Sequence, residues 1–89
     1  MKITENFIIK NTLGLHARAA AAFVKVANRY QAEIVVLKDE TSVNGKSIMG
    51  VLMLAASKGT NIEITAEGHD SQDAIDALKK LIDEKFGEE

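Results

Sequence analysis

Apolar side chains recur at nearly every second position in the first ten residues. Ile3, Phe7 and Ile9 share one face of an extended chain, and Glu5 is the polar exception on that face. A period of two residues is typical of a strand that buries one side. The pattern therefore predicts a first strand over Lys2–Lys10.

The same two-residue period returns in the middle of the chain and again after residue 60. Apolar side chains dominate residues 33–38, and in residues 60–67 they alternate with acidic and threonine side chains. The pairs Asp39-Glu40 and Asn44-Gly45 are turn-forming and bound a short segment between them. The three further strands predicted are Glu33–Lys38, Thr41–Asn44 and Thr60–Glu67.

Apolar residues spaced three or four apart predict the helices. One such stripe places a first helix from Ala17 to about Tyr30. A second, short helix over residues 48–55 follows Ser47, which stands where an N-cap is expected. For the last helix Asp70 or Ser71 is in position to cap the first turn.

The apolar stripe of the last helix is long and extends to Phe86. The predicted order is strand, helix, strand, strand, helix, strand, helix. This order indicates an α+β domain whose antiparallel or mixed sheet carries helices on one face. The pattern leaves the strand order open, and a ferredoxin-like split βαβ arrangement fits as well as its relatives.

Composition narrows the class of protein. A chain of 89 residues suits a single domain, residues 1–89. The absence of cysteine excludes disulfides and thiolate metal sites. No apolar run reaches the roughly 18 residues of a membrane span, so we expect a cytoplasmic protein without membrane insertion. A net charge of -2 and the lack of tryptophan argue against nucleic acid as a partner.

The stretch GLHARAAAAFV places His16 at the start of the first predicted helix. The first amides of a helix lack internal partners and, with the helix dipole, bind anions such as phosphate. The backbone amides of Ala17 and Arg18 would supply such donors, and the Arg18 guanidinium suits phosphate bidentately. Gly14 allows the preceding turn to adopt unusual backbone angles.

Neutral imidazole is a good nucleophile near pH 7, so His16 could receive a phosphoryl group and pass it on. The sequence shows no carboxylate cluster for a metal and no glycine-rich nucleotide loop, and we expect neither a metal nor a cofactor. A match to so short a motif supports a phosphoryl-transfer role only as a hypothesis, however. His16 and Arg18 taken on their own also suit an ordinary solvated helix start.

Ser47 and the apolar residues after it allow two interpretations. An N-cap serine needs no further role, but a phosphate on Ser47 would make it a regulatory site. Ile48, Met49, Leu52 and Met53 cannot all face a core from so short a helix. Some of them are expected to form an exposed apolar patch for partners, unless the helix simply covers the core.

Three longer stretches carry a family resemblance: NTLGLHARAA, VNGKSIMGVLMLAASKGT and EITAEGHDSQDAIDALKKL. Together they resemble HPr, the histidine-containing phosphocarriers of the bacterial phosphotransferase system, over almost the whole chain. The resemblance implies an open-faced β-sandwich of four antiparallel strands with three helices on one face. It also implies that enzyme I phosphorylates His16 on Nδ1, that Arg18 assists, and that the phosphate passes to an enzyme IIA domain.

The resemblance extends to regulation and docking. It implies that an HPr kinase/phosphorylase can modify Ser47, and that Ile48, Met49, Leu52 and Met53 contact partners together with the first helix. For a small relay protein we expect a monomer. The final acceptor of the phosphate, a sugar or a regulatory protein, is left open by the sequence.

The chain departs from the family motif HARPA, because Ala19 replaces the proline. Such variants resemble members from bacteria whose phosphotransferase system is incomplete or regulatory, which favours regulation over sugar transport. One alternative is therefore a regulatory binding module that works by contact alone, although relatives of that kind tend to lack the histidine. Another is an acylphosphatase-like enzyme, which would need an arginine that the turn Asn11–Leu15 does not contain.

Overall fold

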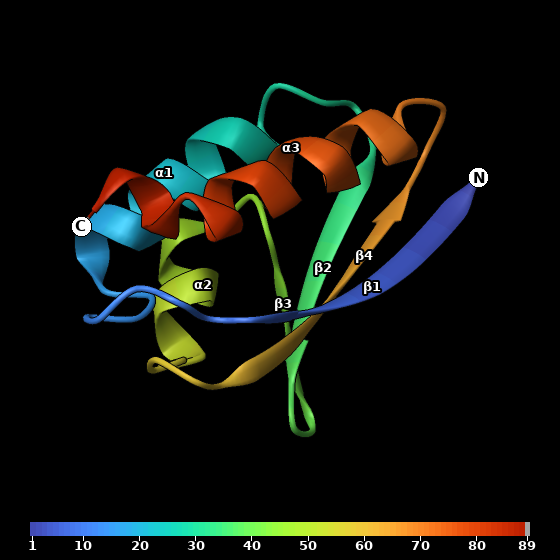
Figure 1. The fold of residues 1–89 in the computed structure, drawn as a ribbon. Coiled ribbons are helices and arrows are strands. Elements are labelled where there is room, and N and C mark those ends of the chain that lie inside the picture. Colours follow the sequence, from blue (N-terminus) through green and yellow to red (C-terminus); the bar gives the residue numbers. More distant parts are fainter. Residues whose placement is uncertain (89) are drawn as a thin grey trace.

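The computed structural model describes residues 1–88, in which strands and helices follow the predicted order (Figure 1). The strands are β1 (Lys2–Ile8), β2 (Glu33–Lys38), β3 (Thr41–Asn44) and β4 (Asn61–Glu67). The helices are α1 (Ala17–Ala27), α2 (Ile48–Met53) and α3 (Ser71–Asp83), and a 3-10 turn, η1 (Lys85–Gly87), follows α3. The longest of these helices has 13 residues, and within residues 1–88 none is long and apolar enough to cross a bilayer.

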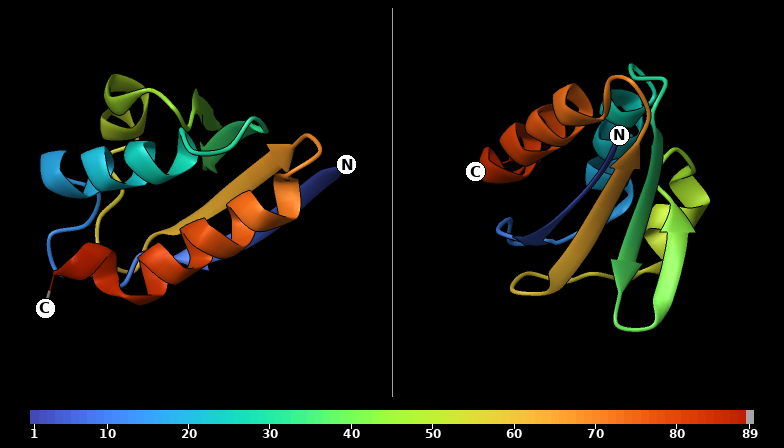
Figure 2. Two further views of the ribbon diagram at one scale, coloured as in Figure 1. Left: turned by 90° about the horizontal axis from the view of Figure 1, so that it is seen from above. Right: turned by 90° about the vertical axis from the view of Figure 1, so that its right-hand side faces the viewer.

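The four strands form one sheet in the order β1-β4-β2-β3, and every neighbouring pair is antiparallel. This order resolves what the hydrophobic pattern leaves open. The helices lie on one face of the sheet, and the other face carries no helix (Figures 1 and 2). The open-faced α+β sandwich that the resemblance implies is thus confirmed.

Alternation along the strands decides which side chains enter the core. In β4 the register places Ile62 opposite Phe7 of β1 and Ile64 opposite Val36 of β2, and all four are buried. Each large apolar side chain removed from water contributes about 1.5–3 kcal/mol. The helices complete this core with fully buried side chains of Phe23, Ile75, Leu78 and Ile82.

The first helix is shorter than predicted, because it ends at Ala27 rather than Tyr30. The Asn28 side chain donates to the carbonyl of Val24 at 3.0 Å, and the Arg29 and Tyr30 amides bond to carbonyls three residues earlier. Bonds of this 3-10 type tighten and end a helix. Tyr30 still packs against the core, which explains why it follows the apolar stripe.

The predicted bounds of three other elements shift by one or two residues. The first strand ends at Ile8, although Ile9 still bonds with the segment before β4. Gly59, with φ of +89°, accounts for the break in the regular ladder there, and β4 begins one residue later than predicted. The second helix stops before Ala55, whose φ of +48° is left-handed and ends a helix.

Asp70 occupies the N-cap position of α3, but its side chain makes no capping bond. Its two carboxylate oxygens accept from the amides of Gln31 and Ala32 at 2.8 and 2.9 Å. The Gln31 amide, foremost, and the Ala32 amide hold the pKa of Asp70 below its ordinary value, against the opposing effect of desolvation. Asp70 thus joins the α1–β2 connection to the start of α3.

The apolar stripe of the last helix continues beyond the helix itself. Phe86 is buried as expected, but it lies in η1 and not in α3.

Candidate functional site

The turn that precedes α1 is held firmly against the segment after α2. Gly14 has φ of +69°, the left-handed conformation expected of a glycine in this turn. A β-carbon at Gly14 would come within 2.5 Å of the carbonyl oxygen of Ala56. The next residue, Leu15, is buried and donates its amide to that same carbonyl at 2.8 Å. The position of His16 is therefore fixed by backbone packing on the preceding side.

His16 is the N-cap of α1, as the sequence predicts. Its backbone is extended, with φ of -79° and ψ of -177°, and its carbonyl accepts the first helical bond from Ala20 at 2.8 Å. The amides of Ala17, Arg18 and Ala19 precede that first bond, so they lack a partner inside the helix. Because the side chains of Ala17 and Arg18 are exposed, this end of α1 is open to a ligand.

Arg18 lines an open hollow beside the histidine. The other residues around this hollow are Thr12 and Leu13 from the preceding turn and Glu88 from the end of the chain. The guanidinium is close enough to Glu88 to contribute to the lowering of the Glu88 pKa. The structure thus brings Arg18 to the same end of α1 as His16, as the sequence predicts.

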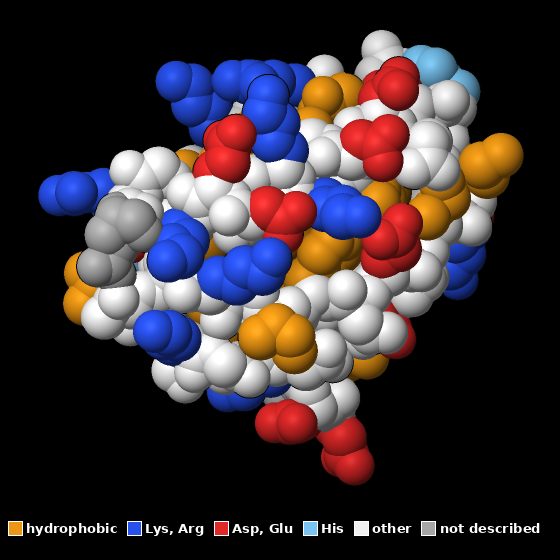
Figure 3. All heavy atoms as spheres, viewed as in Figure 1, with side chains coloured by type: hydrophobic (Ala, Val, Ile, Leu, Met, Phe, Trp, Pro, Cys, Tyr) orange, Lys and Arg blue, Asp and Glu red, His pale blue; other side chains and the backbone are white. Residues whose placement is uncertain are grey.

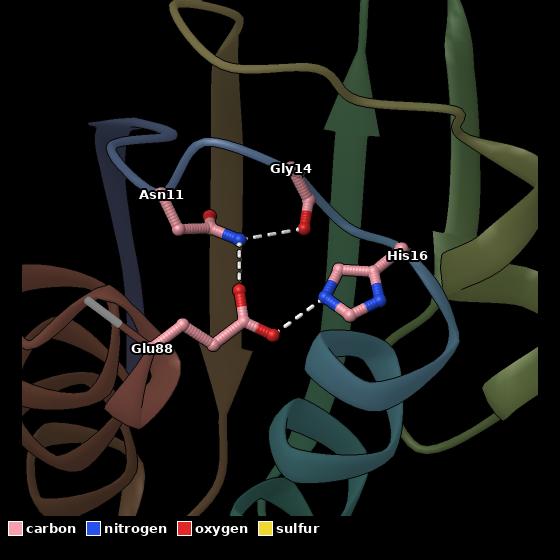
Figure 4. Close-up of polar contacts among 4 residues, drawn as sticks. All are labelled: Asn11, Gly14, His16 and Glu88. Carbon is pink, nitrogen blue, oxygen red and sulfur yellow. Dashed lines mark hydrogen bonds and ion pairs between the residues drawn. The ribbon is translucent and has the colours of Figure 1, made fainter.

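Glu88 is a site residue that the sequence analysis did not identify. One of its oxygens, Oε2, lies 2.5 Å from His16 Nε2, and the other, Oε1, accepts from Asn11 Nδ2 at 2.9 Å (Figure 4). These hydrogen bonds, first from Asn11 and then from His16, lower the pKa of Glu88, and the charges of His16 and Arg18 act in the same direction. The His16 contact joins residues 72 positions apart, so no local motif signals it.

Asn11 is the fully buried centre of this arrangement. Besides the bond to Glu88, its Nδ2 donates to the carbonyl of Gly14 at 2.8 Å. Its Oδ1 has no hydrogen-bond partner among residues 1–88. Both neighbours of Nδ2 are acceptors, which fixes the orientation of the amide and leaves the oxygen unpaired. In the sequence Asn11 looks like an ordinary turn residue, so its bridging role was missed.

Ser47 caps α2 as predicted, because its Oγ accepts from the Gly50 amide at 3.1 Å. The four apolar residues expected at the partner surface divide into two groups. Ile48, Met49 and Met53 are exposed, whereas Leu52 is half-buried and packs against the core. An exposed apolar patch therefore exists on α2, but Leu52 contributes less to it than expected.

Charged side chains are mixed over the face shown in Figure 3. Lysine and arginine side chains gather over the helical side of this view, with acidic side chains among them. No group of three or more potential metal-ligating side chains occurs within residues 1–88.

Comparison with known proteins agrees with this geometry. The family model described as "PTS HPr component phosphorylation site" matches residues 3–84. Phosphocarrier protein HPr of Neisseria meningitidis serogroup A is 48% identical over 97% of both chains, and that of Pseudomonas aeruginosa is 53% identical over 90% of both. A crystal structure of HPr from Thermoanaerobacter tengcongensis superposes with a TM-score of 0.94, at 48% identity over 98% of both chains. The chain therefore belongs to the HPr family, the phosphocarrier proteins of the phosphotransferase system.

Proposed function

We propose that His16 accepts a phosphoryl group from enzyme I, which takes it from phosphoenolpyruvate, and passes it to an enzyme IIA domain. The observation that carries this proposal is the position of His16 at the N-cap of α1, directly before helix amides that lack internal partners. Its side chain is 29% exposed, so a donor protein can reach the ring. Membership of the HPr family supports enzyme I and enzyme IIA domains as the partners.

The transfer needs positioning and charge stabilisation more than many catalytic groups. The lone pair of the His16 Nδ1 would attack phosphorus, and the bond to the donor would break as the new nitrogen–phosphorus bond forms. The amides of Ala17 and Arg18, together with the positive end of α1, would hold the phosphoryl oxygens. The Arg18 guanidinium would bind the same oxygens with two parallel hydrogen bonds.

Docking would use the apolar residues around this end of the molecule. Ile48, Met49 and Met53 are exposed on α2, and Leu13 is 67% exposed in the turn before His16. Leu13 was not identified from the sequence and lines the same hollow as Arg18. Methionine side chains adapt to different surfaces, which suits a relay that must bind two partners in turn.

Ser47 is the proposed regulatory site, to be phosphorylated by an HPr kinase/phosphorylase where the cell has one. Ser47 stands directly before Ile48 and Met49, which belong to the exposed apolar patch on α2. A phosphate there would place negative charge at the edge of an apolar contact and weaken docking to an acidic partner.

The proposal also includes the location of the protein, its oligomeric state and the final acceptor of the phosphate. It would act as a cytoplasmic monomer, without a cofactor and without binding nucleic acid. The phosphate would end on an incoming sugar or on a regulatory protein. Ala19 in place of the family proline favours the regulatory outcome, in which the protein serves an incomplete phosphotransferase system without sugar transport.

The test is to incubate the purified protein with phosphoenolpyruvate and enzyme I from the same organism and to measure its intact mass. We expect an acid-labile gain of one phosphoryl group, present in His69→Ala and absent from His16→Ala. His69 is the matched control because it is the other histidine of the chain and is exposed before α3. If the folded wild type gains no mass, the carrier proposal is wrong, and contact-based regulation through α2 becomes the better interpretation.

A further inference from the structure

The transfer proposed above does not explain the contact between Glu88 and His16. Both carboxylate oxygens of Glu88 are used, one on His16 Nε2 and one on Asn11 Nδ2. Its side chain keeps only 14% of its surface exposed. A glutamate side chain is normally solvated, so the burial of Glu88 against the histidine needs an explanation.

The backbone before Glu88 delivers the carboxylate to this place. Lys85, Phe86 and Gly87 all have left-handed φ angles, of 57°, 58° and 77°. Phe86 is buried in the core, which anchors this tight turn to the body of the protein. Left-handed non-glycine residues cost free energy and persist where their surroundings require them. The turn therefore holds the Glu88 side chain beside His16 at the start of α1.

Asn11 adds a second restraint at an energetic cost. Its amide nitrogen serves both the Gly14 carbonyl and Glu88, while its buried oxygen has no partner among residues 1–88. A buried acceptor without a hydrogen bond is destabilising. A buried polar atom without a protein partner calls for an explanation in the contacts around it. Here the explanation is the bridge from the turn before His16 to Glu88.

The bond to Glu88 decides where the histidine carries its proton. An ionised carboxylate can only accept, so Nε2 of His16 must be the donor in this contact. A neutral imidazole has one N–H, which leaves Nδ1 with a free lone pair. Nδ1 makes no capping bond to α1 and has no partner among residues 1–88, and in Figure 4 it points away from Glu88.

We propose that Glu88, held by Asn11, is a positioning residue that keeps the proton of His16 on Nε2 and so leaves Nδ1 as the nucleophile. This inference rests on the proposed transfer function. When Nδ1 attacks a phosphoprotein donor, the nitrogen–phosphorus bond forms and the electron pair of the broken bond returns to the donor. The proton stays on Nε2, and the carboxylate of Glu88 balances the positive charge that the ring acquires.

The direct test is ¹⁵N NMR of the imidazole nitrogens at pH 9, where ordinary histidine side chains are neutral. We expect the wild type to show a protonated Nε2 and an unprotonated Nδ1. In Glu88→Ala both nitrogen shifts should move toward the average of the two tautomers. Glu84→Ala removes an exposed carboxylate from the same end of the chain and should leave the shifts unchanged. Unchanged shifts in Glu88→Ala, or a wild-type proton on Nδ1, would overturn the proposal.

The rate of phosphoryl acceptance gives a second readout. Glu88→Ala should slow acceptance from enzyme I by about tenfold, the size expected when a hydrogen bond to a charged group is lost. Glu88→Gln keeps an accepting oxygen without the charge, so its rate should lie between the two. Circular dichroism would show that each variant is folded. A wild-type rate in Glu88→Ala would contradict the positioning role.

The two measurements separate this inference from the function beneath it. If the wild type accepts no phosphoryl group, the transfer function fails, whatever the tautomer. If the wild type accepts the group and Glu88→Ala is unchanged in both rate and nitrogen shifts, the transfer stands and the role of Glu88 fails.

Discussion

Gly14 packs so closely on Ala56 that a β-carbon at position 14 would lie 2.5 Å from the Ala56 carbonyl oxygen. The same carbonyl accepts the amide of Leu15, the residue before His16. Any side chain at position 14 must therefore push the turn away from the segment after α2. Because this turn leads directly into the N-cap, the displacement reaches the histidine.

Gly14→Ala should lower the free energy of unfolding by about 3 kcal/mol, since left-handed strain alone costs up to that amount and the clash adds to it. Chemical denaturation would measure the loss, and the mass assay would show reduced phosphoryl acceptance. Gly59→Ala is the matched control, because Gly59 has φ of +89° but a β-carbon there would meet nothing within 4 Å. Equal losses in the two variants would show that the Ala56 contact is unimportant.

Asp70 gives a pH-dependent prediction. Its pKa is lowered chiefly by the Gln31 amide, so its ionised form stabilises the folded state. That stabilisation is complete above the pKa of the unfolded chain, near 4, and is lost as the pH falls through the lower folded value. Asp70→Asn should therefore lower the thermal midpoint at pH 7, and its difference from the wild type should shrink as the pH falls below about 4.

The matched control for Asp70 is Asp73→Asn, which removes the same charge from the first turn of α3. Asp73 is exposed, whereas Asp70 holds the amides of Gln31 and Ala32. Thermal unfolding of the three proteins from pH 7 to pH 2 would compare them. A difference between wild type and Asp70→Asn that stays constant over this range would contradict the prediction.

Residues whose chemistry is local could be predicted from the sequence. Gly14, His16, Arg18 and Ser47 lie in a turn or at a helix start that the local sequence predicts, and the structure places them at the expected positions. The strands were predictable for the same reason, because alternation of two residues records which face is buried. The strand order was not, since it depends on pairing between distant segments.

The long-range contacts escaped sequence analysis for a physical reason. Glu88 reaches His16 across 72 positions, and Asp70 reaches Ala32 across 38. Glu88 and Asp70 both lie in polar segments of the sequence, where an acidic residue is ordinary and does not indicate a distant contact. Asp70 shows the difficulty most clearly, because its position before α3 indicates a cap while its carboxylate serves another loop.

Ser47 allows its structural role to be separated from its regulatory one. Ser47→Ala removes the acceptor of the Gly50 amide and should cost about 1 kcal/mol of stability. Ser47→Asp keeps a capping oxygen, so its stability should stay near that of the wild type while its added charge slows acceptance from enzyme I. Urea denaturation and the initial rate of phosphorylation would measure the two effects.

Ser42→Asp is the control for charge alone, because Ser42 lies on the exposed edge strand β3. It should leave the phosphorylation rate unchanged. If Ser47→Asp also accepts phosphate as fast as the wild type, negative charge beside α2 does not weaken docking, and the regulatory proposal for Ser47 fails.

Ala19→Pro restores the residue of the family motif and should preserve both fold and transfer. The amide of Ala19 lies before the first helical bond, so proline there removes no intrahelical hydrogen bond. We expect the free energy of unfolding to change by less than about 1 kcal/mol, because proline also restricts the unfolded chain. Phosphoryl acceptance should stay within about twofold, since proline at position 19 leaves the amides of Ala17 and Arg18 in place for the proposed contact with phosphate.

Ala21→Pro is the contrasting variant, because Ala21 is exposed but lies further into α1, beyond the first helical bond. Proline there removes a helical bond and should cost about 3 kcal/mol or more. Ala19 itself is fully buried, so the test also asks whether the core has room for the ring. A loss in Ala19→Pro as large as that in Ala21→Pro would mean that the core around Ala19 has adapted to alanine. In that case the packing around Ala19 would no longer accommodate the proline of the family motif, and restoring proline would require compensating changes around α1.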